Sequence, residues 1–405
     1  MSADDRIAYV LKLARAMHGY GYSAHRLEEV LGATAHRLGL EAQFFSTPTS
    51  LFAAFGPQSD QRTFLLRVEP GDTDLGRLTA VDFVSLQVAR GELTPAEGSS
   101  ALDAVAGAEP PYGHVLTVFA FGLASAAAAR FLGGGLPEVG LAGGLGLITG
   151  LLSALTSRRP TLARIYEPLA AFIATLVATA FGVLVLPVNV LVAVLGGLIV
   201  LIPGLTLTTA MTELASRHLA SGTARLSGAL LLFVTMIFGV AVGRKVAQLL
   251  FGAPELTTLA GLPAWTELVA LVLAPLGFLV LLRARPADAG WILVAGWIAF
   301  GAARAGGALL GPELGAFAGA FAVGILANLY GLLRDRPPQI LLVPSLLLLV
   351  PGSFGFRSVS AMLERRVESG IETAFTMFFI ASGIVAGLLL ASAIVPRRTA
   401  DLRKP

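Results

Sequence analysis

The 405-residue chain contains no cysteine. That absence excludes disulfide bonds, a catalytic thiolate and cysteine-ligated metals. Charged residues are also scarce, at 14% of the chain, against roughly 25% in soluble globular proteins. Hydrophobic residues make up 55% instead, and the mean hydropathy is +0.77. The composition therefore predicts a polytopic α-helical membrane protein.

Histidine is scarce as well, and no two histidines have the i, i+4 or HExxH spacing that places metal ligands on one helical face. The five are His18, His25, His36, His114 and His218. We therefore expect no metal site and no cofactor. The hydroxyl-rich stretch 46–50 has no nearby histidine and no G-x-S-x-G elbow. We also expect that the protein is not an enzyme.

The first part of the chain differs from the rest in charge. Residues 1–112 hold 9 Lys and Arg against 14 Asp and Glu, a net charge of −5, whereas the remainder has a net charge of +8. Periodicity and turn residues predict helices at about 7–17, 27–38, 75–90 and 95–106, and strands at 42–46, 51–55 and 63–68. The pattern indicates a small cytoplasmic α+β domain over 1–112, followed by a short proline-rich linker.

Hydrophobic segments follow one another from His114 onward. We expect ten spans, near 114–132, 138–156, 166–186, 188–203, 226–246, 263–282, 290–309, 314–333, 339–351 and 372–395. Most are close to the ~20 residues that cross a hydrocarbon core. The fourth and ninth are shorter, and each ends at a Pro-Gly pair. Glycines in the runs 140–146 and 315–319 are expected to let helices pack closely.

Basic residues set the expected orientation. With the N-terminal domain in the cytoplasm, thirteen Lys and Arg of the membrane part lie inside and six lie outside. That excess favours cytoplasmic N- and C-termini. Such flanking charges are topology signals, so no nucleic-acid partner is expected. The N-terminus also lacks the basic and apolar regions of a cleaved signal peptide.

An internal repeat organises the membrane part. Five pairs of identical residues share one offset: Pro203/Pro351, Gly204/Gly352, Arg217/Arg365, Ser221/Ser369 and Gly222/Gly370. We expect two five-helix units, residues 113–250 and 251–405. Because five is odd, the second unit enters the membrane from the opposite side. Inverted repeats of this kind are typical of secondary transporters, whose substrate lies between broken helices at the repeat interface.

Several motifs in this order resemble those of the threonine/serine exporters, the ThrE-like proteins. They are RAMHGYGYSAHRLEE at 15–29, FFSTPTS at 44–50, LGRL at 75–78, the Pro-Gly pair at 203–204, GTAR at 222–225 and PGSFGFR at 351–357. The resemblance covers nearly the whole chain. It implies a ten-span exporter of threonine, serine or similar small amino acids, driven by the proton gradient.

The two Pro-Gly pairs indicate where a substrate binds. A helix that begins after such a pair presents free N–H groups and the positive end of its dipole, which suit an amino-acid carboxylate. Nearby hydroxyls and one guanidinium add donors. The expected substrate-binding residues are Pro203, Gly204, Thr206, Thr208, Thr209, Thr212, Pro351, Gly352, Ser353 and Arg357. The alternatives stay open: hydroxyls in membrane helices often bond the local backbone, and Arg357 also fits an external topology charge.

Four other polar residues lie in or beside the spans. Glu213 and Glu167 are candidates for proton coupling. The alternatives are an ion pair of Glu213 with Arg217 at i+4, and for Glu167 a helix-start acid. Asn189 and Asn328 are amides that need partners, and gating, binding or helix packing would each use them.

We therefore expect a proton-driven exporter that works by alternating access around the two breaks. Its partners are a small amino acid, protons and the lipid bilayer, and a homo-oligomer stays open. The expected location is the inner membrane of a bacterium. The alternative is a ligand-regulated channel or membrane receptor with the N-terminal domain as its sensor.

Overall fold

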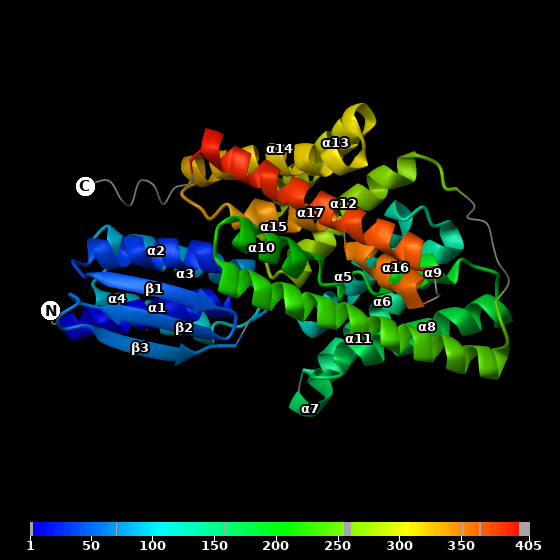
Figure 1. Ribbon diagram of the computed structural model, residues 1–405, viewed down its shortest axis with the longest axis horizontal. Helices are drawn as coiled ribbons and strands as arrows, with labels where there is room; N and C mark the ends of the chain where they lie inside the picture. Colours follow the sequence, from blue (N-terminus) through cyan, green and yellow to red (C-terminus); the bar gives the residue numbers. More distant parts are fainter. Residues whose placement is uncertain are drawn as a thin grey trace.

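The computed structural model of the protein describes residues 3–69, 71–157, 159–254, 261–349, 352–363 and 366–396. Pro351 and Arg365, two members of the repeat pairs, lie outside these residues. Figure 1 shows the N-terminal domain at one end of the long axis and the long apolar helices over the rest.

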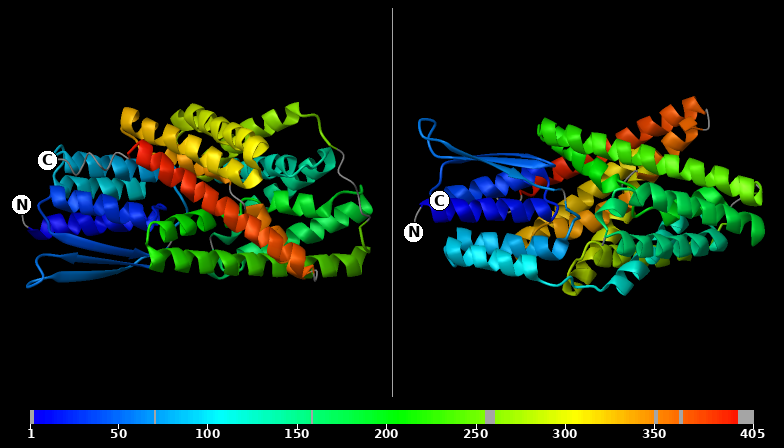
Figure 2. Two further views of the ribbon diagram at one scale, coloured as in Figure 1. Left: turned by 45° about the horizontal axis from the view of Figure 1, so that its top comes forward. Right: turned by 90° about the horizontal axis from the view of Figure 1, so that it is seen from below.

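The N-terminal domain is an α+β unit, as predicted. Its elements are α1 (Ala3–Gly19), α2 (Ala24–Arg37), β1 (Ala42–Thr47), β2 (Ser50–Phe55), β3 (Arg62–Arg67), α3 (Leu75–Ala89) and α4 (Pro95–Gly107). The strands form an antiparallel sheet in the order β1-β2-β3. Figure 2 shows this sheet as one layer and the helices as the other. The buried core between them includes Tyr9, Leu13, Leu27 and Leu51.

Local signals explain where these helices begin. Thr94 and Glu97 form a capping box at the start of α4, with the Thr94 N–H donating to Glu97 at 2.8 Å. The Asp74 carboxylate accepts from the Arg77 N–H at 2.9 Å at the start of α3. At α2, however, the N-cap residue Ser23 makes no side-chain capping bond.

Among the described residues, the membrane part holds one very short α-helix, twelve longer ones and a 3-10 helix, η1 (Pro286–Asp288). The α-helices are α5 (His114–Phe131), α6 (Leu136–Thr156), α7 (Pro160–Ala163), α8 (Tyr166–Leu184), α9 (Val190–Gly197), α10 (Gly204–Ala215), α11 (Leu219–Phe251), α12 (Trp265–Leu281), α13 (Ala289–Leu310), α14 (Pro312–Arg334), α15 (Gln339–Leu349), α16 (Gly352–Leu363) and α17 (Val367–Ile394). Within the described ranges, eight helical stretches are long and apolar enough to cross a membrane, and the 17-residue α12 is slightly shorter. Their outer surfaces are apolar, as at Phe238 and Phe379.

Two predicted spans differ from the structure. Residues 188–203 were expected to form one short span, which is wrong, because α9 has only eight residues. At 1.5 Å per residue it is about 12 Å long and cannot cross a core of about 30 Å. The chain unwinds after Gly197 and resumes as α10 at Gly204. The next span, expected at 226–246, is the 33-residue α11.

The two halves of the membrane part have matching elements. Helices α10 and α16 start at residues 204 and 352 and end at 215 and 363, an offset of 148 at both ends. The starts of α11 and α17, at 219 and 367, share it. Helix α8 packs on α11 as α14 packs on α17, and α6 on α9 as α13 on α15.

The matching elements run in opposite directions along the long axis. In Figure 1, α10 and α15 lie at the end beside the N-terminal domain, whereas α9 and α16 lie toward the other end. Helix α11 leads away from the domain, and α17 leads back toward it. The first residues of α10 and α16 therefore meet in the middle of the bundle.

The glycine runs pack helices closely at some positions and not at others. A Cβ on Gly146 of α6 would lie 2.6 Å from the Phe121 carbonyl oxygen of α5, and one on Gly315 of α14 would lie 2.5 Å from the Ala303 carbonyl oxygen of α13. Gly140 and Gly144, on the same helix as Gly146, face open space. Close packing is thus confirmed for one face of each run.

Candidate functional site

A cavity of about 610 Å³ lies where the two broken helices meet. Volumes of ~300–1,000 Å³ are typical of small-ligand sites. Its wall combines the break 199–206, the start of α16, the facing ends of α6, α8 and α12, and a loop of the N-terminal domain. Of the expected site residues it contains Pro203, Gly204, Thr206, Gly352 and Glu167.

The first residues of α10 and α16 touch each other. A Cβ built on Gly352 would lie 3.4 Å from Gly204 Cα and 2.6 Å from Ile202 Cγ2. Both glycines are buried. In the first turn of α10, the Gly204 N–H donates to the Ile202 carbonyl at 2.7 Å, while the next N–H groups have no carbonyl partner within the helix. The contact brings the first residues of α10 and α16 to one cavity.

The threonines of α10 divide between two cavities. Thr206 is exposed and lines the large one. Thr208, Thr209 and Thr212 line a smaller cavity of about 100 Å³, whose other walls come from α2 and α15. The Thr208 hydroxyl donates to the Gly204 carbonyl at 3.2 Å, and the Thr212 hydroxyl to the Thr208 carbonyl at 2.8 Å. Two of the four hydroxyls therefore bond their own helix.

Acidic and phenolic side chains line the other side of the large cavity. Glu167 and Tyr166 stand at the start of α8, and Asp72 comes from the loop before α3. The Tyr166 hydroxyl donates to the Thr149 carbonyl at 3.0 Å, which fixes the ring. Within the part of the chain that the structure describes, neither Asp72 nor Glu167 has an ion-pair partner.

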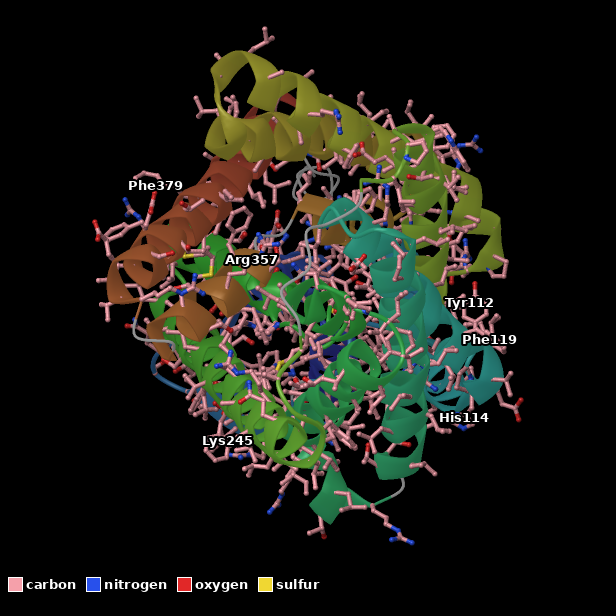
Figure 3. The ribbon with its side chains drawn as sticks, turned by 90° about the vertical axis from the view of Figure 1, so that its right-hand side faces the viewer. Tyr112, His114, Phe119, Lys245, Arg357 and Phe379 are labelled. Atoms are coloured by element: carbon pink, nitrogen blue, oxygen red, sulfur yellow. The ribbon has the colours of Figure 1, made fainter. Side chains whose placement is uncertain are left out.

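Ser353 and Arg357 lie one helical turn apart on α16, next to the second break. Neither is among the described residues that line the large cavity. Figure 3 shows Arg357 inside the ring of helices, whereas Phe379 lies on its outside. The Arg357 Nε is buried and has no hydrogen-bond partner among the described residues. Pro351, directly before Gly352 in the sequence, lies outside the described ranges.

Glu213 lies outside both cavities, in a buried network between α10, α11 and the N-terminal domain. Its side chain is fully buried and accepts from the Ala24 N–H at 2.8 Å and the Ser221 hydroxyl at 2.7 Å. The Arg225 Nε donates to both carboxylate oxygens at 3.1 Å. The pairing with Arg217 does not form, because Arg217 has a φ of +66° in the turn that ends α10.

Glu213 also caps helix α2 of the N-terminal domain. Ala24 is the first residue of α2, the helix whose N-cap Ser23 makes no capping bond. A carboxylate at a helix start satisfies a free N–H and is attracted by the helix dipole. Next to this contact, Glu28 of α2 pairs with His218 at 3.2 Å and accepts from the Ser46 N–H at 2.7 Å.

His18 lies close to this network. Its side chain is buried, and Nε2 lies 3.0 Å from the Thr47 carbonyl oxygen. Burial lowers the pKa of His18 below its ordinary value, and the charge of Arg225 acts in the same direction. His18 therefore binds a proton less readily in the folded domain than in the unfolded chain.

The two asparagines serve as helix contacts. The Asn189 side chain accepts from the Val192 N–H at 3.1 Å and caps α9. The backbone N–H of Asn189 donates to the Glu138 side chain at 2.9 Å. The Asn328 side chain donates to the Val395 carbonyl at 3.0 Å and joins α14 to the end of α17.

Sequence reasoning missed Asp72, Tyr166 and Arg225. Arg225 belongs to the GTAR motif, and Tyr166 directly precedes Glu167, so a local signal existed for both. Asp72 had none, since it lies in a polar loop of another domain. No group of three or more His, Asp or Glu side chains that would hold a metal occurs within the described ranges.

Two family models match the chain. Residues 8–247 match the model described as "Putative threonine/serine exporter", and residues 267–394 match "Threonine/Serine exporter, ThrE". No solved structure matches.

Similar curated proteins include fungal membrane proteins and uncharacterised fungal proteins. An uncharacterised protein of Schizosaccharomyces pombe is 26% identical over 97% of this chain and 51% of its own length. The pheromone-regulated membrane protein 10 of Debaryomyces hansenii is 26% identical over 91% of this chain and 37% of its own. The protein of that name in Saccharomyces cerevisiae is 24% identical over 92% and 48%. The chain thus spans about half the length of these relatives or less, and they give no support to a bacterial source.

Proposed function

The chain belongs to the threonine/serine exporter family, and from that premise we propose that it is a secondary transporter that exports threonine, serine or similar small amino acids. The observation that carries the proposal is the contact of Gly204 with Gly352 at the wall of the 610 Å³ cavity. Two broken helices that meet at a cavity are the arrangement in which secondary transporters hold a substrate.

The wall of the cavity suits a zwitterion. Its carboxylate would face the first turn of α10, where the N–H groups that follow Gly204 and the Thr206 hydroxyl are the donors, next to Gly352 of α16. Its ammonium group would face Asp72 and Glu167 on the other side. In a site shielded from water, charges bound in this way interact more strongly than in bulk solvent.

Alternating access would follow from the two halves. The shared offset and the opposite directions of α11 and α17 support an inverted five-helix repeat. One half would rock against the other around the Gly204–Gly352 contact, exposing the cavity first on one side and then on the other. Glu167, at the cavity wall, is our candidate for carrying the coupled proton.

The membrane orientation is proposed from charge. The excess of Lys and Arg supports a cytoplasmic location for the N-terminal domain and both termini at the cell membrane. The cavity would then load from the side on which the N-terminal domain lies.

A transport assay on the purified full chain tests the proposal. Proteoliposomes with an imposed pH gradient are expected to accumulate labelled threonine or serine, and a protonophore is expected to abolish the accumulation. If no member of a panel of small amino acids moves under any gradient, the proposal is refuted. Flux that ignores an opposing proton gradient, with unitary currents in planar bilayers, would favour the channel alternative.

A further inference from the structure

The N-terminal domain contacts both halves of the membrane part. On the second half, the Leu75 N–H donates to the Leu282 carbonyl at 2.9 Å and the Gly76 N–H to the Arg283 carbonyl at 3.1 Å. The Arg283 side chain also pairs with Asp74 at 3.4 Å. A Cβ on Gly76 would lie 2.7 Å from the Arg283 oxygen, so the backbones touch only because residue 76 is glycine. We call these contacts the α12 anchor.

On the first half, the domain contacts the turn between α10 and α11. Glu213 accepts from the Ala24 N–H, and His218 pairs with Glu28 at 3.2 Å. We call these contacts the α10 anchor. The α12 anchor includes two hydrogen bonds from backbone to backbone, whereas every contact of the α10 anchor uses the side chain of Glu213, Glu28 or His218. Side-chain contacts of this kind break and re-form without unwinding either helix.

A loop of the N-terminal domain, directly before the α12 anchor, forms part of the cavity wall. Residues 71–73 line the cavity together with Leu282 and Arg283 at the α12 anchor and with the start of α10. These residues are held in place by the domain itself: a Cβ on Gly71 would lie 1.9 Å from the Gly19 oxygen, and the Asp74 N–H donates to the Tyr20 carbonyl at 3.4 Å. The domain therefore covers the cavity on its own side.

We propose that the N-terminal domain is a gate for the cavity, fixed at the α12 anchor and released at the α10 anchor when the cavity opens toward it. The inference rests on the proposed function for its role in transport. In the proposed transport cycle α10 moves relative to α12, because the two helices belong to different halves. The domain cannot stay bound to both, so the contacts of one anchor must break. Glu213 is then a positioning residue: it holds the gate closed and does not touch the substrate.

The first test measures access to the cavity and needs no transport. Thr206→Cys supplies the sole thiol of the chain, and its reaction rate with a membrane-impermeant maleimide is measured from the side of the N-terminal domain. Glu213→Gln removes the charge that holds Ala24 and Arg225, and because breaking a buried pair is strongly destabilising we expect reaction to be about tenfold faster or more. Asp335→Asn, which weakens the exposed Arg90–Asp335 pair at 3.3 Å on the second half, should leave the rate unchanged. Equal rates in the two variants overturn the proposal.

The second test keeps Glu213 and locks the domain in place. Glu28→Cys with His218→Cys allows a cleavable cross-linker to close the α10 anchor, and Arg90→Cys with Asp335→Cys places the same link on the second half. Cross-linking the first pair should stop transport until the linker is cleaved, and cross-linking the second pair should not. Transport that continues with the first pair linked overturns the gate. If neither double-cysteine variant transports threonine before the cross-linker is added, the result counts against the proposed function. The accessibility of Thr206→Cys then still decides whether the domain is a gate.

Discussion

A single methyl group at the contact between the two breaks should impair transport. The Cβ of Gly352→Ala would lie 2.6 Å from Ile202 Cγ2, about 1 Å closer than an ordinary carbon–carbon contact. Ile202 is β-branched and has few alternative rotamers, so the strain must separate the breaks or displace that side chain. Overpacking of this kind costs about 1–3 kcal/mol.

The expected effect on transport follows from that strain. If the breaks must be in contact at one point of the cycle, about 1–3 kcal/mol corresponds to a loss in rate of about 5- to 150-fold. The assay is initial uptake of labelled threonine by proteoliposomes with matched protein content. Gly144→Ala is the control, because a Cβ there meets open space within a membrane helix. Wild-type transport by correctly inserted Gly352→Ala would refute the idea that the contact belongs to the transport cycle.

Three further predictions concern the cavity and the N-terminal domain. Asp72→Asn should raise the apparent KM for threonine about tenfold, because the substrate ammonium group loses a charged acceptor. Asp60→Asn, on the connection between β2 and β3, should leave the KM unchanged. Equal KM values in the two variants refute the role of Asp72. The pKa of His18 lies below its ordinary 6.5, so the unfolded chain takes up a proton more readily than the folded domain. The stability of α1, measured by hydrogen exchange corrected for intrinsic rates, should therefore fall as the pH drops below 6.5. His18→Gln should make this stability less dependent on pH. Tyr9→Phe removes a buried hydroxyl without a partner among the described residues, so the opening free energy of α1 should stay equal or rise by about 1 kcal/mol; a loss of that size would mean that the hydroxyl has a partner in the folded domain.

Features with local causes were predictable from the sequence. The capping box at Thr94 and Glu97 fixes the start of α4 within the chain itself. Hydropathy located the long helices, and the Pro-Gly pair marked the start of α10 at Gly204. The second Pro-Gly pair likewise marked the start of α16 at Gly352, whereas α17 begins at Val367, five residues before the predicted span.

Features that depend on packing were not predictable. Helical spacing places Thr209, Thr212 and Glu213 on one face, but only the assembled helices decide which side chain meets a cavity. Glu213 was expected to carry protons or to pair with Arg217. Its partners are twelve positions away at Arg225 and 189 away at Ala24, and no periodic pattern relates residues at such separations.

The cap of α2 has a consequence for biogenesis. Ala24 and the acid that completes its helix are 189 positions apart, so the N-terminal domain leaves the ribosome long before its own capping group exists. At about 5–20 residues per second, that group follows after roughly 10–40 seconds. During this interval the first turn of α2 lacks the contact with Glu213. The interface between the N-terminal domain and the turn after α10 can therefore form only after α10 has been synthesised.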